Sequence, residues 1–160
     1  MDKQYQHAIM LVDDEESILK ALKRLFRKTS YQILTASSGQ EGLVRLKNTE
    51  KPVSLIISDQ RMPEMTGAQF LEQAKKIFPD ALRFLLTGYS DMDAVVDAVN
   101  KGEIHRYLNK PWNDDDLLLL VKQALQQYEL VFENRRLTAL TLKQNEELNA
   151  LNQGLEKKVK

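Results

Sequence analysis

The sequence predicts an α/β domain built on a doubly wound, parallel, five-stranded sheet, with an extended C-terminal helix. Short apolar runs alternate with amphipathic stretches five times, which is typical of strands and helices in a parallel sheet. After about residue 128 proline is absent, and Leu, Glu, Lys, Asn and Gln dominate. This change separates a compact domain, residues 1–128, from a long exposed helix, residues 129–160.

The predicted strands are the apolar runs. The first and third are nearly continuous in apolar residues, as expected of strands that are buried on both faces of a sheet. The other three include polar residues, which indicates more exposed strands or strand ends. The five runs are residues 8–12, 31–36, 53–57, 82–86 and 104–108.

The predicted helices lie between and after these runs, where apolar residues recur at a spacing of three and four. Pro79 ends the third helix because proline cannot continue one, and Gly102 stands at a plausible end of the fourth. The five helices are predicted around residues 18–26, 42–46, 70–77, 95–99 and 117–128.

Composition excludes several classes of protein. The chain has 23 Lys and Arg against 23 Asp and Glu, so its net charge of +0 gives no support for direct nucleic-acid binding. The absence of cysteine excludes disulfides, thiolate metal sites and a cysteine nucleophile. No apolar run is long enough to span a bilayer, and the polar N-terminus does not resemble a signal peptide. We therefore expect a cytoplasmic protein without a membrane partner.

Polar residues that carry chemistry follow four of the predicted strands. Asp13 and Asp14 follow the first run, Asp59 the third, Thr87 the fourth and Lys110 the fifth. The carboxyl ends of parallel strands meet at one edge of a sheet, where ligands bind. We expect these five side chains to converge there.

Such a group suits phosphoryl transfer. Clustered carboxylates are hard oxygen ligands for Mg²⁺, and an aspartate beside the metal can become an acyl phosphate. Lys110 can pair with a phosphoryl oxygen and the Thr87 hydroxyl can donate to another. Taken singly, the acids could be helix caps or turn residues, and Lys110 could be a surface charge. Because all of these residues are expected at the same edge of the sheet, we favour the interpretation that they form one functional site.

Four segments together resemble the signature of bacterial two-component response regulator receiver domains, over residues 8 to about 128. They read LVDDE at residues 11–15, IISDQRMPEMTG at 56–67, LTGY at 86–89 and YLNKPW at 107–112. The resemblance implies a flavodoxin-like (βα)5 fold and phosphorylation by a sensor histidine kinase. It also implies a phosphoacceptor signalling domain rather than an enzyme, with slow self-dephosphorylation at most. The pattern is similar to receivers attached to HD-GYP phosphodiesterases or similar output modules.

The resemblance also implies a role for each site residue. Asp59 is the expected phosphoacceptor and Lys110 its cationic partner. Asp14 is expected to bind Mg²⁺ directly and Asp13 through water. Asp59 and the backbone carbonyl of Arg61 complete the expected metal ligands.

The switch residues implied by the family are Thr87 and Tyr107. Thr87 is expected to move toward the phosphoryl group and Tyr107 to fill the vacated space, biasing the fourth helix, fifth strand and fifth helix. Bulky Tyr89 and cationic Arg61 flank the site, so we expect a fairly long-lived phosphorylated state. The peptide bond between Lys110 and Pro111 is expected to be cis, which proline permits.

The long helix carries a heptad pattern that predicts a two-stranded coiled coil and a homodimer. The alternative is a single helix, or disorder beyond about residue 150. The pattern is still running at Lys160, so we expect a fragment that continues into a missing output domain. The seam positions are Leu130, Asn134, Leu137, Thr141, Gln144, Leu148, Leu151 and Leu155.

Two other functions remain open at this point. A Mg²⁺-dependent phosphohydrolase with an aspartyl nucleophile uses similar residues, but such enzymes typically carry Asp-x-Asp, whereas Gln60 and Arg61 follow Asp59. A phosphorylation-independent dimerisation scaffold would need only the coiled coil. His7 is interpreted as part of a polar N-terminal lead and His105 as a structural residue of a strand.

Overall fold

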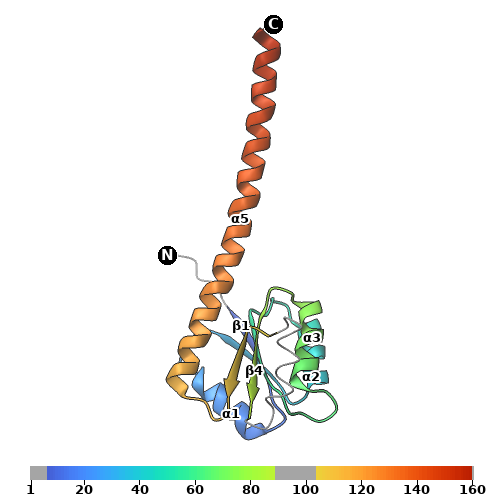
Figure 1. Ribbon diagram of the computed structural model, residues 1–160, viewed down its shortest axis with the longest axis vertical. Coiled ribbons are helices and arrows are strands. Elements are labelled where there is room, and N and C mark those ends of the chain that lie inside the picture. Colours follow the sequence, from blue (N-terminus) through green and yellow to red (C-terminus); the bar gives the residue numbers. More distant parts are fainter. Residues whose placement is uncertain (1–6, 89–103, 160) are drawn as a thin grey trace. The chain divides into compact units, whose positions relative to one another are not determined.

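The structure, a computed structural model, describes residues 7–88 and 104–159, with side chains described as far as residue 151. Five parallel strands form one sheet in the order β2-β1-β3-β4-β5 (Figure 1). This order places β1 and β3 at the centre and confirms the predicted parallel, five-stranded, flavodoxin-like sheet. The strands are β1 (Ala8–Val12), β2 (Gln32–Ala36), β3 (Leu55–Asp59), β4 (Leu82–Thr87) and β5 (Arg106–Asn109).

Four helices lie within the described residues, and each begins two or three residues before the apolar residues that predicted it, since capping and first-turn residues come before the apolar face. Ser38 caps α2 by accepting from the N–H of Glu41, and Thr66 forms a capping box with Gln69 at the start of α3. The predicted helix at residues 95–99, with Gly102 at its end, lies outside the described residues. The helices are α1 (Glu16–Leu25), α2 (Gly39–Asn48), α3 (Gly67–Ile77) and α5 (Asp114–Val159).

The core has two layers because the sheet is covered on both faces. Alternate strand residues point to opposite faces, so Met10 packs in one cluster and Leu11 in the other. Leu46 of α2 and Phe70 of α3 belong to the first cluster. Leu22 of α1 and Val121 of α5 belong to the second. The sheet is therefore rigidly held between α2 and α3 on one side and α1 and the first turns of α5 on the other.

Three strands extend further than the apolar runs predict. β3 continues to Asp59, β4 to Thr87 and β5 to Asn109. The backbone ladder continues through these residues, where Asp59 is opposite Leu86 and Thr87 is opposite Asn109. The last residues of these strands have polar side chains, so the apolar pattern in the sequence stops before the backbone pairing does. As a result, site residues are held by the ladder itself.

His7 differs from its sequence interpretation. It is buried directly before β1, where its Nδ1 lies 2.9 Å from Ser54 Oγ and its ring packs edge-on against Tyr31. His105 is a structural residue as expected, since its Nδ1 accepts the backbone N–H of Arg83 at 3.0 Å. Polar neighbours in the sequence concealed the burial of His7.

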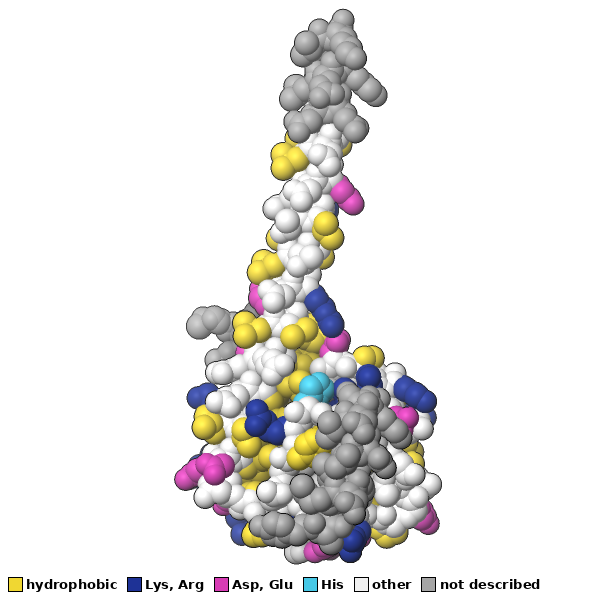
Figure 2. Space-filling view, viewed as in Figure 1, with side chains coloured by type: hydrophobic (Ala, Val, Ile, Leu, Met, Phe, Trp, Pro, Cys, Tyr) yellow, Lys and Arg dark blue, Asp and Glu magenta, His cyan; other side chains and the backbone are white. Residues whose placement is uncertain are grey.

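The chain divides into two compact units, Met1–Tyr128 and Glu129–Lys160. The second unit is the C-terminal part of α5. Figure 2 shows hydrophobic side chains recurring along this helix, and the exposed ones include Leu137, Leu142 and Leu148. No helix in the described ranges has the length and apolarity required to cross a bilayer.

Candidate functional site

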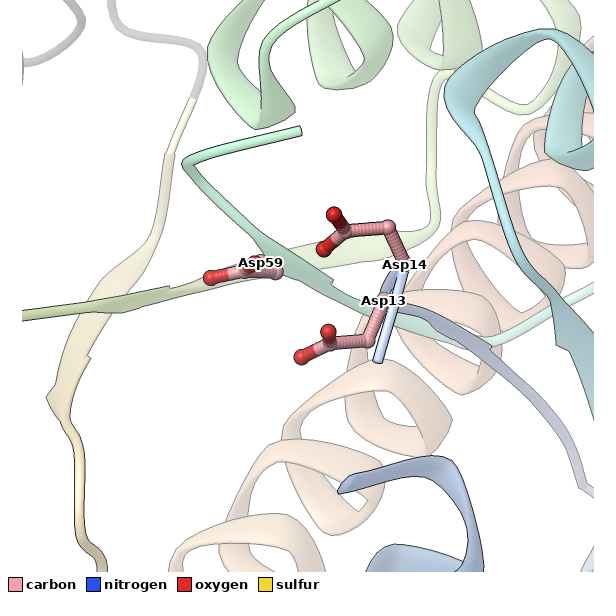
Figure 3. A group of neighbouring side chains, drawn as sticks. All are labelled: Asp13, Asp14 and Asp59. Carbon is pink, nitrogen blue, oxygen red and sulfur yellow. The ribbon is translucent and has the colours of Figure 1, made fainter. Parts of the chain in front are cut away.

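Three acidic side chains meet at the carboxyl ends of the two central strands. Asp13 and Asp14 directly follow β1, and Asp59 is the last residue of β3. One carboxylate oxygen from each lies within 4.8 Å of the others, and the three side chains point the same way (Figure 3). Asp13 and Asp59 are buried, whereas Asp14 is exposed. The convergence expected from the sequence is present for all three acids.

Lys110 joins two of these acids. Its Nζ lies 2.9 Å from Asp59 Oδ1 and 3.0 Å from Asp13 Oδ2. The backbone N–H of Lys110 donates to Thr87 O at 2.9 Å, which ties the end of β5 to the end of β4. The peptide bond to Pro111 is cis, as expected. The ammonium therefore stands in place between the phosphoacceptor candidate and its neighbouring acid.

Burial and charge crowding shift the ionisation of this group. Burial raises the pKa of Asp13, and the hydrogen bonds from Glu15 N–H and Lys110 offset only part of that rise. Burial also raises the pKa of Asp59, with the negative charge of Asp13 adding to the effect. Burial opposes the charge on Lys110, but its bonds to Asp59 and Asp13 outweigh this and raise the pKa of its ammonium. The cluster thus holds more negative charge than one lysine neutralises.

The donor set fits a divalent metal ion. Three carboxylates within bonding reach of one point are hard oxygen ligands, which suit Mg²⁺, and exposed Asp14 leaves room for water ligands. A divalent charge would relieve the cost of the buried carboxylates. Arg61, whose backbone carbonyl is the third expected direct ligand beside Asp14 and Asp59, is exposed two residues beyond Asp59 in the β3–α3 loop.

The expected switch residues lie on the strands beside β3. Thr87 is the last residue of β4 and is 1% exposed, next to Leu86, which pairs with Asp59. Tyr107 lies on β5, opposite Leu85, and is partly buried against the core cluster of α2 and α3. Burial raises the pKa of its hydroxyl. Tyr89, expected to slow loss of the phosphoryl group, lies outside the described residues.

Trp112 and the acids after it have structural positions. Trp112 packs partly buried against the core cluster of α1 and α5, and its Nε1 donates to Asp114 Oδ1 at 3.0 Å. Asn113 accepts the N–H of Asp116, and the three acids at 114–116 occupy the first turn of α5. Acidic residues in the first turn interact favourably with the helix dipole, so these acids suit a structural role at the start of α5.

Gln60 and Gly67 are site residues that sequence reasoning missed. Gln60 is 5% exposed, and its Oε1 accepts the N–H of Ala68 at 2.9 Å. The N–H of Gly67 donates to the backbone carbonyl of Gln60, also at 2.9 Å. The junction depends on backbone groups of α3 that are distant from Gln60 along the chain, so no pattern in the sequence indicates it.

Gly67→Ala should disrupt the site through a backbone clash. An added Cβ would lie 2.1 Å from Asp59 O, and neither backbone segment can move without displacing β3 or α3. We expect a loss of unfolding free energy of about 3 kcal/mol or more in chemical denaturation. Gly39→Ala is the matched control, because its Cβ would meet the flexible Met65 Sδ at 2.7 Å. Equal losses for both variants would contradict this explanation.

Comparisons with known proteins agree with this geometry. Residues 9–122 match the family described as "Response regulator receiver domain". The hydrogenase transcriptional regulatory protein HoxA of Cupriavidus necator is 36% identical over 132 residues, which cover 82% of this chain and 27% of HoxA. This chain thus spans about a quarter of the length of the curated relatives that it matches.

Solved structures give the same result. The signal receiver domain of an HD domain-containing protein from Pseudomonas fluorescens Pf-5 is 38% identical with a TM-score of 0.73, covering 78% of this chain and 98% of that one. An uncharacterized protein from Neptuniibacter caesariensis is 47% identical with a TM-score of 0.76, covering 82% of this chain and 96% of that one.

Proposed function

Because the chain belongs to the response regulator receiver domain family, we propose that Asp59 is the residue that accepts the phosphoryl group. The observation that carries the proposal is the Asp59 carboxylate itself. It is buried at the end of a central strand, 2.9 Å from the Lys110 ammonium and within reach of two further acids. Among the described residues, no other cluster of three metal-binding side chains is present.

The proposed metal ligands are Asp13, Asp14, Asp59 and the backbone carbonyl of Arg61. Mg²⁺ at this position would neutralise the developing charge on the transferred group. Asp59 supplies the attacking oxygen: a new bond forms from its Oδ to phosphorus as the bond from phosphorus to the donor breaks. Lys110 stays beside the oxygen it already faces and pairs with the phosphoryl group. Because Asp59 is buried, water has little access to its carboxylate.

Membership of the family indicates which protein donates the phosphoryl group. Response regulator receiver domains are phosphorylated by sensor histidine kinases, and we propose such a kinase as the partner of this chain. Thr87 and Tyr107 are the proposed switch pair. Their support is position, since Thr87 ends the strand next to Asp59 and Tyr107 lies on the following strand. Added phosphoryl oxygens give the Thr87 hydroxyl a new acceptor.

Labelling by a small phosphodonor tests the proposal. Acetyl phosphate with Mg²⁺ should add one phosphoryl group per chain, detected by intact mass spectrometry. Chelation by EDTA should abolish labelling, because the crowded carboxylates then face the donor without a neutralising ion. A phosphomonoester such as p-nitrophenyl phosphate should not be turned over. Sustained turnover of that ester would favour a phosphohydrolase instead.

We also propose that the second unit of the chain mediates a homodimer through a two-stranded coiled coil. Its described seam positions include exposed Leu130, Leu137 and Leu151 on one position of the heptad and exposed Leu148 on the other. Receivers similar to this chain come from proteins named as a transcriptional regulator and as an HD domain-containing protein. The receiver itself therefore does not identify the output domain to which we propose the helix leads.

Leu148→Lys should convert the dimer to a monomer, because it places two like charges at a buried seam position. Sedimentation velocity measures the change. Leu142→Lys is the matched control, since Leu142 is similarly exposed on the same helix but lies off the seam. A monomeric wild type, or equal loss of dimer in both variants, would rule out this interface.

A further inference from the structure

Gln60 connects three segments around the site. Its backbone N–H donates to Leu86 O at 3.0 Å, which ties it to β4 beside Thr87. Its backbone carbonyl accepts the N–H of Gly67, and its side-chain Oε1 accepts the N–H of Ala68. The residue is therefore bonded on both its main chain and its side chain, and it is buried.

These bonds occupy the start of α3. The first N–H groups of a helix have no partner within the helix and need an acceptor. Gln60 supplies acceptors for Gly67 and Ala68, and the Thr66 hydroxyl supplies one for Gln69 at 3.2 Å. The two caps differ in position, since Thr66 precedes the helix on the surface side and Gln60 lies next to Asp59. Gln60 thus closes the loop of residues 61–66 at its base.

We propose that Gln60 is a positioning residue for the metal site. Its side-chain bond to α3 holds the chain direction immediately after Asp59, and so fixes where the carbonyl of Arg61 points. That carbonyl is one peptide bond beyond Gln60 and is the backbone ligand of the proposed Mg²⁺ site, so this inference rests on the proposed function. Residues outside the ligand set that orient a ligand commonly decide metal affinity.

Gly67 allows the start of α3 to pack directly against the backbone of Asp59, which limits how far the two segments can move separately. No side chain separates the start of α3 from the backbone of Asp59, where an added Cβ would lie 2.1 Å from the carbonyl oxygen. A change at the Gln60–Ala68 bond cannot be absorbed by side-chain rearrangement between the two segments. The α3 start and the loop must shift together, and the Arg61 carbonyl moves with them.

Calorimetric titration with Mg²⁺ tests the role of Gln60. Gln60→Met keeps the length of the side chain but removes the acceptor, and we expect the dissociation constant for Mg²⁺ to rise about tenfold. Thr66→Val is the matched control: it is isosteric and deprives Gln69, in the same helix turn, of one acceptor. Both variants should melt at lower temperature, but only Gln60→Met should bind Mg²⁺ more weakly.

Gln60→Glu is the rescue variant, because a carboxylate can accept the Ala68 N–H and is favoured at a helix N-terminus. Its Mg²⁺ affinity should return to at least that of the wild type, and should remain there in high salt, where added charge alone is screened. Wild-type affinity in Gln60→Met, equal weakening in Thr66→Val, or failure of the rescue would each overturn the inference. A wild type without any Mg²⁺ binding would overturn the proposed function itself.

Discussion

Asp59→Asn should abolish labelling by acetyl phosphate while leaving the fold intact. An amide cannot attack phosphorus, and in the part of the chain that the structure describes, the only other carboxylate paired with Lys110 is Asp13, which follows β1 and is fully buried. We expect intact mass spectrometry to show no added phosphoryl group. The matched control is Asp115→Asn, which alters an exposed acid in the first turn of α5 and should label as the wild type does.

The same variant should be more stable than the wild type when Mg²⁺ is absent. The raised pKa of Asp59 means that its charged form is less favourable in the folded than in the unfolded chain. Stability is therefore lost as pH rises through the folded-state value, and Asn avoids that loss at neutral pH. The gain in melting temperature should shrink as pH falls toward the range where Asp59 protonates. A lower melting temperature at neutral pH, or labelling that persists, would contradict the proposed role.

Lys110→Met should slow labelling by about a hundredfold or more, since it removes a preorganised positive charge from the reacting oxygens. The ammonium lies 2.9 Å from Asp59 and 3.0 Å from Asp13, so both carboxylates lose their cation. The initial rate of acetyl phosphate labelling at saturating Mg²⁺ measures the effect.

Two control variants separate charge from position. Lys122→Met removes an exposed charge from α5 and should label at the wild-type rate. Lys110→Arg keeps the charge but replaces a compact ammonium by a planar fork, so it should recover only part of the rate. Full activity in Lys110→Met would show that the metal ligands suffice and that the ion pair is structural.

The sequence predicted the sheet and the meeting of Asp13, Asp14, Asp59 and Lys110 because both follow from strong signals. Continuous apolar runs identify the central strands, and parallel strands bring the residues that follow them to one edge. The strand ends were predicted one or two residues early, since Asp59 and Thr87 are polar yet remain in the ladder. The chemical roles of these residues stay predictions that the variants above address.

Other features could not be predicted because they depend on contacts distant in sequence. His7 stands among polar residues, and its burial depends on Ser54 and Tyr31. Gln60 has no neighbour at a helical or strand spacing that marks it as buried, and its role depends on the start of α3. In both cases burial depends on a few contacts with residues distant in sequence rather than on a repeating pattern.

The Lys110 ammonium already contacts carboxylate oxygens of Asp59 and Asp13 in this structure. If Asp59 becomes an acyl phosphate, as we propose, Lys110 would exchange one anionic neighbour for another at nearly the same place. On this proposal, Lys110 would contribute little to the energy difference between the resting and phosphorylated conformations, even though we expect its contribution to the labelling rate to be large. On this view Lys110 keeps its position when Asp59 is phosphorylated. The conformational change would then depend on residues whose contacts differ between the unphosphorylated and phosphorylated proteins.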